Sequence, residues 1–248
     1  MTEIEINGTV TGSVSEKEKI NGRIDNTKSS ARAIVVANGS IEDPARTYKR
    51  MTGYFGFTRD DIVISADGGA SNTLKMGLVP DVVIGDMDSI KLKAKEEIRE
   101  KSAKTIYLPT SPEKDESDTQ LAVDYAISMG VKKLILLGAT GGRIDHTLAN
   151  IILLSSPGLE GIDARILTDN SDIFITRKPV TISGNPGKTV TLMSLSPYTY
   201  FTGTSGLKYE LKEEKLQFSP VRGLSNETTE KKVYLGVREG TLLVIREL

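Results

Sequence analysis

Short apolar runs recur along most of the chain, and they end at glycine or aspartate. Four of them read AIVVANG (residues 33–39), IVISADGG (62–69), DVVIGDMDS (81–89) and KLILLG (133–138). Between these runs, apolar residues follow the period of a helix. The helices expected from this pattern cover residues 70–77, 91–101, 118–129 and 147–155. Strands that alternate with helices predict a parallel sheet with helices on both faces, so the expected fold class is α/β with a Rossmann-like sheet.

The pattern changes after about residue 177. Runs rich in threonine and valine then alternate apolar and polar positions between turn residues, which predicts a small β-sandwich. We therefore expect a polar N-terminal extension over residues 1–30, an α/β domain over residues 31–177 and a β-sandwich over residues 178–248. Because ligands of open α/β sheets bind beyond the carboxyl ends of the strands, the residues at those ends are the first candidates for a site.

Composition narrows the chemistry. With 248 residues and a formal net charge of −1, the chain gives no electrostatic case for nucleic acid or an anionic membrane. It contains no apolar run of the length of a membrane span, and its first residues lack a secretory pattern, so we expect a cytoplasmic protein. It has no cysteine and one histidine, His146. A metal would therefore be bound by oxygens, which favours magnesium, manganese or calcium.

Asp86 and Asp88 follow the apolar run that ends at Gly85. In extended backbone, residues two apart point to the same side, so these carboxylates would repel each other. A divalent cation offsets that repulsion well, because hard cations prefer carboxylate oxygen. The alternative is an ordinary solvated turn or a helix cap.

Other strand ends also carry acidic residues. Asp67 is followed by Gly68 and a second glycine, which allow close approach of a ligand to the backbone. Asp115 and Asp118 stand just before a predicted helix, whose N-terminus is a natural phosphate site. Each has a simpler interpretation: Asp67 as part of a strand-to-helix turn, and Asp118 as a helix N-cap.

A glycine-rich turn follows the run at 133–138. Gly141 and its neighbours can form an anion-binding nest of backbone N–H groups, and Arg143 adds a fixed positive charge. Alternatively, Asp145 caps the next helix and Arg143 is a surface residue. Taken together, the strand ends favour a magnesium–nucleotide site. Residues 184–189, GNPGKT, resemble part of a P-loop, but Ile182 stands where the loop requires glycine, so a β-turn is expected there.

These motifs, in this order, resemble the thiamine pyrophosphokinase family. The likeness rests on DGGAS, GDMDS, DESDTQLAVDYA, GATGGRIDHTLANIILL and GLSNE, and it runs from about residue 33 to the end. Met87 stands where the family usually has phenylalanine, and Ser117 where it usually has threonine. Residues 1–30 have no counterpart. The resemblance implies an α/β nucleotide-binding catalytic domain followed by a β-sandwich that binds thiamine.

The resemblance also implies a reaction and roles. ATP and thiamine would give thiamine diphosphate and AMP, with Mg²⁺ as cofactor, in a homodimer whose active site lies at the subunit interface. Asp86, Asp88 and Asp118 would be the catalytic magnesium ligands. Apart from the resemblance, the chemistry of the reaction suggests a carboxylate near the thiamine hydroxyl as general base, and Asp118 or Asp88 is the candidate. The substrate-binding residues implied are Asp67, Gly68, Asp115, Gly141, Arg143, Asp145, Ser225 and Asn226.

Two other functions remain open at this point. One is a diphosphokinase for another alcohol acceptor such as a hydroxymethylpterin, although the GLSNE segment of the β-domain argues against it. The other is a non-catalytic module that binds a magnesium–nucleotide complex, for which the number of acidic positions is more than binding requires.

Overall fold

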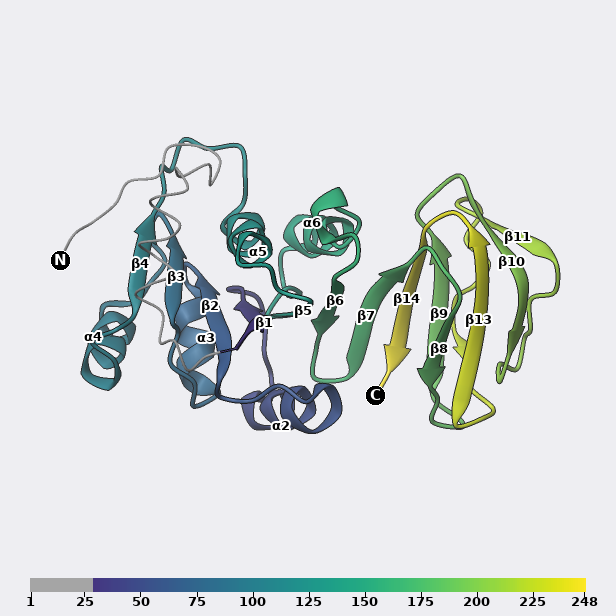
Figure 1. Cartoon of the computed structure of the whole chain (residues 1–248), viewed down its shortest axis with the longest axis horizontal. Coiled ribbons are helices and arrows are strands. Elements are labelled where there is room, and N and C mark those ends of the chain that lie inside the picture. Colours follow the sequence, from purple (N-terminus) through teal and green to yellow (C-terminus); the bar gives the residue numbers. More distant parts are fainter. Residues whose placement is uncertain (1–28) are drawn as a thin grey trace. The chain divides into compact units, whose positions relative to one another are not determined.

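The structure is a computed structural model that describes residues 29–248 (Figure 1). These residues form two compact units, which divide between Asp169 and Asn170. Most of the predicted extension over residues 1–30 lies outside the described residues; Ser29 and Ser30 belong to the first strand.

The first unit is built on a parallel sheet. Its strands are β1 (Ser29–Val36), β2 (Asp61–Ala66), β3 (Val82–Gly85), β4 (Ile106–Pro109), β5 (Lys133–Leu137) and β6 (Asp163–Leu167). They lie in the order β6-β5-β1-β2-β3-β4, and each neighbouring pair is parallel. The predicted parallel sheet is confirmed. Because the chain runs outward from β1 to β4 and then returns to place β5 beside β1, the strand order reverses between β1 and β5.

Helices cover both faces of this sheet. They are α2 (Pro44–Phe55), α3 (Gly69–Lys75), α4 (Leu92–Lys101), α5 (Asp118–Ser128), α6 (Ile144–Leu153) and a 3₁₀ turn, η1 (Pro157–Leu159). Figure 1 shows α5 and α6 on one side of the sheet and α2 and α3 on the other. Helix α6 begins three residues earlier than the apolar pattern predicts, at the end of the glycine-rich turn.

Helix α2 was not expected from the sequence, where the region before residue 60 looks merely polar. Its signals are local ones at the two ends. The Asp43 side chain accepts a hydrogen bond from the Arg46 N–H at 2.9 Å, and Pro44 occupies the first helical position. Gly56 ends the helix in the left-handed conformation, with a φ of 70°.

The apolar runs are continuous because the central strands are covered on both faces. Strand β2 is buried at every residue, and so is β3. Ile34, Val35 and Ile64 are completely inaccessible to solvent. The rigid sheet that results fixes the positions of the loops at its carboxyl edge.

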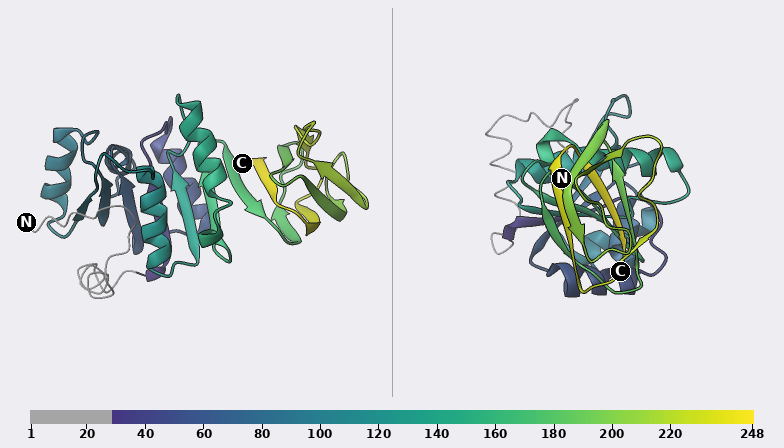
Figure 2. Two further views of the ribbon diagram at one scale, coloured as in Figure 1. Left: turned by 90° about the horizontal axis from the view of Figure 1, so that it is seen from above. Right: turned by 90° about the vertical axis from the view of Figure 1, so that its right-hand side faces the viewer.

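The second unit is a β-sandwich. Its strands are β7 (Ser171–Thr176), β8 (Val180–Ser183), β9 (Thr189–Ser194), β10 (Tyr198–Ser205), β11 (Glu214–Gln217), β12 (Asn226–Glu227), β13 (Lys232–Glu239) and β14 (Leu242–Glu247). They form the layers β12-β9-β14-β7 and β11-β10-β13-β8, with antiparallel pairing throughout (Figure 2). Buried side chains such as Phe174, Leu192, Phe201 and Val233 fill the space between the layers. The predicted sandwich is confirmed.

The two units divide earlier than the boundary at residue 177 that the sequence predicts. Strand β7 looks like a continuation of the α/β pattern, but it pairs along its whole length with β14 of the sandwich. The segment over residues 184–189 is a turn that leads from β8 in one layer to β9 in the other, and Gly187 in it has a φ of 86°. It is therefore a turn between strands.

Among the described residues, no helix has both the length and the apolar character needed to cross a membrane.

Candidate active site

A pocket of about 520 Å³ lies at the carboxyl edge of the parallel sheet, where β1 and β5 are neighbours. Its walls are the loop after β1 (residues 37–40), the end of β2 (66–67), the start of α5 (117–119) and the segment from the loop after β5 into α6 (138–150). This is the place where open α/β sheets bind their ligands, because the loops on the two sides of a reversal in strand order diverge.

The floor of the pocket is made of backbone. The loops after β1 and β5 are joined by hydrogen bonds from Gly39 N to Gly138 O at 2.7 Å and from Ser40 N to Thr140 O at 2.8 Å. A Cβ at Gly39 would lie 2.3 Å from the Gly138 carbonyl oxygen, so only glycine fits there. The Asn72 amide, from α3, donates to the carbonyls of Ala37 and Gly39 and holds the first loop in place.

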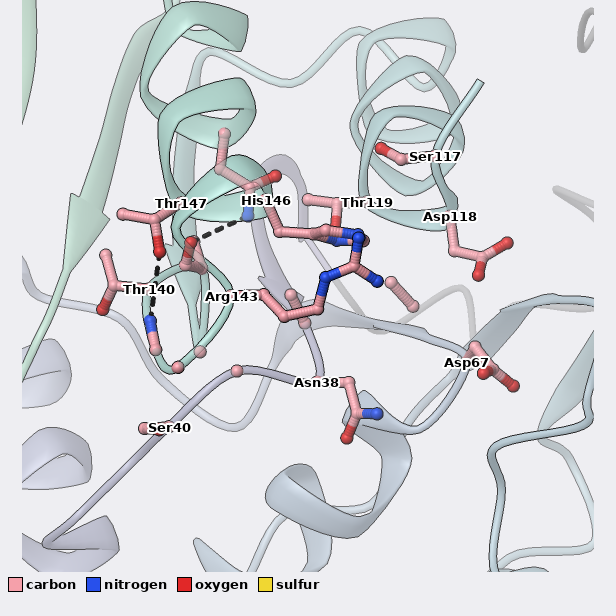
Figure 3. Close-up of a pocket in the computed structure, with 18 of the residues that line it drawn as sticks. Asn38, Ser40, Asp67, Ser117, Asp118, Thr119, Thr140, Arg143, His146 and Thr147 are labelled. Carbon is pink, nitrogen blue, oxygen red and sulfur yellow. Dashed lines mark hydrogen bonds between the residues drawn. The ribbon is translucent and has the colours of Figure 1, made fainter. Parts of the chain in front are cut away.

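Two helices point their N-termini at the pocket. Helix α5 is capped by Ser117, whose hydroxyl accepts from the Gln120 N–H, so Asp118 is the first helical residue and not the cap. At α6, Thr147 accepts a hydrogen bond from the Gly141 N–H at 3.2 Å (Figure 3). The positive ends of helix dipoles and free N–H groups favour an anion at this place.

A cluster of acidic residues adjoins one end of the pocket, where Asp67 is a lining residue. Asp67, Asp86 and Asp88 each offer a carboxylate oxygen, and these oxygens lie within 4.8 Å of one another. The sequence predicts extended backbone between Asp86 and Asp88, but the structure has a turn there instead. Met87 between them is in the left-handed region, with a φ of 65°, and its side chain packs against a cluster of buried residues that includes Val83 and Ile90. The convergence therefore depends on a turn that the apolar Met87 side chain anchors.

Asp67 is the buried member of this cluster. Its exposed fraction is 6%, and its Oδ1 atom has no hydrogen-bond partner within residues 29–248. Burial raises the pKa of the Asp67 carboxyl, the negative charges of Asp118 and Asp86 raise it further, and contacts with Ser89 and the Gly68 backbone lower it. A buried unpartnered carboxylate oxygen beside two more carboxylates fits a divalent cation with oxygen ligands.

Asp118 lies beside this cluster but outside it. A Cβ on Gly85 would lie 2.7 Å from Asp67 Cβ and 3.3 Å from Asp118 Cγ, so the bare glycine lets the two carboxylates approach. The Asp118 Oδ1 atom accepts a hydrogen bond from the Lys114 ammonium at 2.7 Å. The sequence predicts Asp118 as the third metal ligand, whereas the three carboxylates gathered in the structure include Asp67 in its place. The role of Asp118 stays a prediction.

The remaining candidates of the α/β unit differ in position. Arg143 lines the pocket and binds Asp145 through Nε–Oδ1 at 3.2 Å and Nη2–Oδ2 at 2.5 Å. This contact lowers the pKa of Asp145 to about 2. Asp145 does not cap α6, since Arg143 occupies the N-cap position. Gly68 is packed against the Asn38 amide, and Asp115 is an exposed residue of the loop before α5.

Ser225 and Asn226 lie in the β-sandwich unit. Ser225 is exposed and has a φ of 52°. Asn226 is buried, and its side chain is occupied: Nδ2 donates to the Tyr209 carbonyl at 2.8 Å, and Oδ1 accepts from the N–H groups of Tyr209 and Glu227. Asn226 thus fixes the loop that carries Tyr209, which is 66% exposed. Direct contact of either predicted residue with a substrate stays a prediction.

Several pocket residues were not predicted from the sequence. The pocket also includes Asn38, Ser40, Thr119, Thr140 and His146. Figure 3 shows Asn38 and Ser40 on the side of the β1 loop and His146 at the start of α6. Asn38 and Ser40 lie at the end of a buried apolar run, which made them possible site residues. Their place in a pocket could not be predicted, because the pocket forms only where β5 lies beside β1.

A pocket at the reversal point of a parallel sheet, with helix N-termini on two sides and carboxylates at one end, is typical of the class of proteins that bind a phosphate-containing ligand together with a divalent cation. Two family models match the chain: "Thiamin pyrophosphokinase, catalytic domain" over residues 57–166, and "Thiamin pyrophosphokinase, vitamin B1 binding domain" over residues 175–242. The chain belongs to the thiamine pyrophosphokinase family.

Known proteins of similar sequence and fold agree with this membership. Thiamine pyrophosphokinase of Bacillus subtilis is 28% identical over 214 residues, which are 86% of this chain and 96% of the relative. Thiamin pyrophosphokinase 1 of Caenorhabditis elegans is 26% identical over 191 residues, which are 69% of this chain and 73% of that relative. The crystal structure of the Bacillus subtilis enzyme superposes with a TM-score of 0.75 at 25% identity, over 87% of this chain and 98% of that one.

Proposed function

We propose that this chain is a thiamine pyrophosphokinase, which transfers the pyrophosphoryl group of ATP to the hydroxyl of thiamine and releases AMP. The observation that carries the proposal is the convergence of Asp67, Asp86 and Asp88 beside a pocket built from glycine loops and helix N-termini. An anion site that adjoins a carboxylate cluster suits a triphosphate bound together with a divalent cation.

The pocket side of the site binds and orients the triphosphate. The starts of α5 and α6 and the glycine-rich loop after β5 direct N–H groups and positive dipole ends toward phosphate oxygens. Arg143 supplies a fixed cation, and its pairing with Asp145 holds the guanidinium near the entrance of α6. In-line attack on the β-phosphorus asks the protein mainly for such positioning and charge neutralisation.

The acidic side would hold magnesium through Asp67, Asp86 and Asp88. When bound, Mg²⁺ neutralises charge on the phosphate oxygens as it develops during transfer. Without a cation, the three carboxylates would repel the triphosphate, so we expect metal and nucleotide to bind together. Asp118 lies at the same end of the pocket as Asp67 (Figure 3), and we propose that it or Asp88 accepts the proton of the thiamine hydroxyl. The fixed positive charge of thiamine suits this acidic end.

A single assay tests the function. Purified protein is incubated with ATP, Mg²⁺ and thiamine, and AMP and thiamine diphosphate are quantified. We expect equal amounts of both products and none when thiamine is omitted. AMP formation with a hydroxymethylpterin and not with thiamine would instead support a diphosphokinase for another acceptor. Absence of AMP with either acceptor would favour a non-catalytic nucleotide-binding module.

We also propose a homodimer with its active site at the subunit interface, and helix α6 is the surface that supports it. Its residues Ile144, Leu148 and Ile152 recur every four positions, so they lie on one face of the helix, and their exposed fractions are 82%, 57% and 52%. A row of large exposed apolar side chains indicates a surface that another protein covers. The cytoplasmic location expected from the sequence stays a prediction.

The variant Leu148→Glu is expected to convert the dimer to a monomer, because it places a charge in the centre of this apolar row. Light scattering coupled to size-exclusion chromatography gives the mass directly. The matched control is Leu92→Glu, which puts the same charge on another exposed leucine, in helix α4. A monomeric wild-type protein would reject the dimer, and a dimeric Leu148→Glu variant would exclude α6 as its interface.

A further inference from the structure

Lys114 is a largely buried cation that the functional roles above do not use. It lies in the loop between β4 and α5, and its side chain is 9% exposed. Its ammonium donates to Thr110 Oγ1 at 2.7 Å and to Asp118 Oδ1 at 2.7 Å. Burying an ammonium group is costly unless it is paired and hydrogen-bonded. The contacts with Thr110 and Asp118 must therefore offset the free-energy cost of burying the Lys114 ammonium group.

The surroundings of Lys114 are strongly negative. Asp118 follows it by four residues, and Asp67, Asp86 and Asp88 lie at the same end of the site. Within the part of the chain that the structure describes, Lys114 is the cation that forms an ion pair with one of these four carboxylates. The pair fixes the Oδ1 atom of Asp118, while its Oδ2 atom has no hydrogen-bond partner among the described residues.

From this geometry we propose that Lys114 is a positioning residue for the transfer reaction. It holds Asp118 through one carboxylate oxygen and leaves the other oxygen available to the pocket, and Thr110 fixes the ammonium in turn. The inference rests on the proposed function, because it assigns Asp118 a task in that reaction. Because two of the three donors of the ammonium are used within the protein, the role that we assign to Lys114 is to hold Asp118 and not to bind the phosphates.

The variant Lys114→Met tests this role by removing the charge and keeping most of the volume. We expect kcat to fall by about 10- to 100-fold, the usual cost of losing a group that orients a catalytic side chain. The affinity for a non-hydrolysable ATP analogue with Mg²⁺, measured by calorimetry, should stay within about threefold of wild type. Lys114→Arg, which keeps the charge, should recover most of kcat.

A double-mutant cycle separates positioning from other roles. If Lys114 acts through Asp118, Lys114→Met combined with Asp118→Asn should be no slower than Asp118→Asn alone. The matched control is Lys101→Met, because Lys101 and Glu97 form a pair of the same spacing and the same 2.7 Å distance on helix α4, away from the site. That control should leave kcat and analogue affinity unchanged.

The outcomes are distinct. Loss of analogue affinity by more than tenfold in Lys114→Met would make Lys114 a phosphate ligand and overturn the proposal, and so would additive effects in the cycle or an unchanged kcat. If Lys114→Met does not fold, Thr110→Val decides: a fall in kcat with normal analogue affinity and a normal melting curve supports the role, and an unchanged kcat rejects it. A wild-type protein that binds the analogue but forms no AMP would reject the proposed function instead.

Discussion

The substitution Asp86→Asn is expected to lower the rate of AMP formation by about 10³-fold. Asp86 belongs to the three carboxylates that would hold Mg²⁺, and metal-assisted charge stabilisation supplies several kcal/mol, with each ~1.4 kcal/mol worth a factor of ten. Steady-state rates with ATP and thiamine at saturating Mg²⁺ measure the loss. The matched control is Asp60→Asn, an exposed aspartate in the turn before β2, which should keep the wild-type rate.

The stability of Asp86→Asn distinguishes a functional from a structural aspartate. The charge of Asp86 raises the pKa of buried Asp67, after the larger effect of burial, so the two carboxylates repel each other in the folded protein. An acid whose folded pKa lies above its unfolded value destabilises the fold at neutral pH, and removal of a repelling neighbour reduces this effect. The melting temperature measured without metal should therefore be unchanged or higher. A marked fall would show that Asp86 holds the turn.

The substitution Arg246→Met is expected to destabilise the β-sandwich unit by about 3–5 kcal/mol. Arg246 on β14 pairs with Asp172 on β7 at 2.7 Å, with side-chain exposures of 7% and 0%, and its Nη1 donates to the Ser183 carbonyl. Loss of the guanidinium removes this ion pair from the buried Asp172 carboxylate, which costs far more than the pair itself contributes. Chemical denaturation followed by circular dichroism measures the change in the free energy of unfolding.

A more accessible pair one residue along the same strand provides the control. Glu247 binds Lys188 at 2.6 Å, and the side chains of Lys188 and Glu247 are 42% and 39% exposed. Lys188→Met should change the unfolding free energy little, because water screens such pairs and holding two long side chains together costs entropy. Equal effects of the two variants would contradict the importance assigned to the buried pair.

The fold could be predicted from the sequence where burial leaves a simple pattern. The central strands are covered on both faces, so their apolar runs are continuous, and the sandwich strands alternate because one face packs on the core. Helix α2 was not predicted because its middle is polar. The residues that indicate a helix, Asp43, Pro44 and Gly56, lie only at its two ends. The boundary between the two units was predicted too late in the chain, because the sequence of β7 resembles that of the parallel strands before it. The difference is its antiparallel pairing with β14 of the sandwich.

The candidate site could be predicted where one short segment carries the chemistry. The sequence pointed to Asp86, Asp88 and Asp67, and the structure gathers their carboxylates. It could not indicate that Met87 would form the turn between two of them, since no local rule favours a left-handed methionine. Lys114 also went unnoticed, because its importance comes from the carboxylates that other strand ends bring to it.

The backbone contact between Gly39 and Gly138 has a consequence for the order in which the protein is made. The two strands that carry these glycines are paired in register, yet everything from α2 to α5 separates them along the chain. A nascent polypeptide that has not yet produced β5 possesses half of the pocket floor and no partner for it, and such distant pairings form slowly. If the pocket binds a nucleotide as proposed, the appearance of nucleotide affinity during synthesis should mark the moment at which β5 joins the sheet.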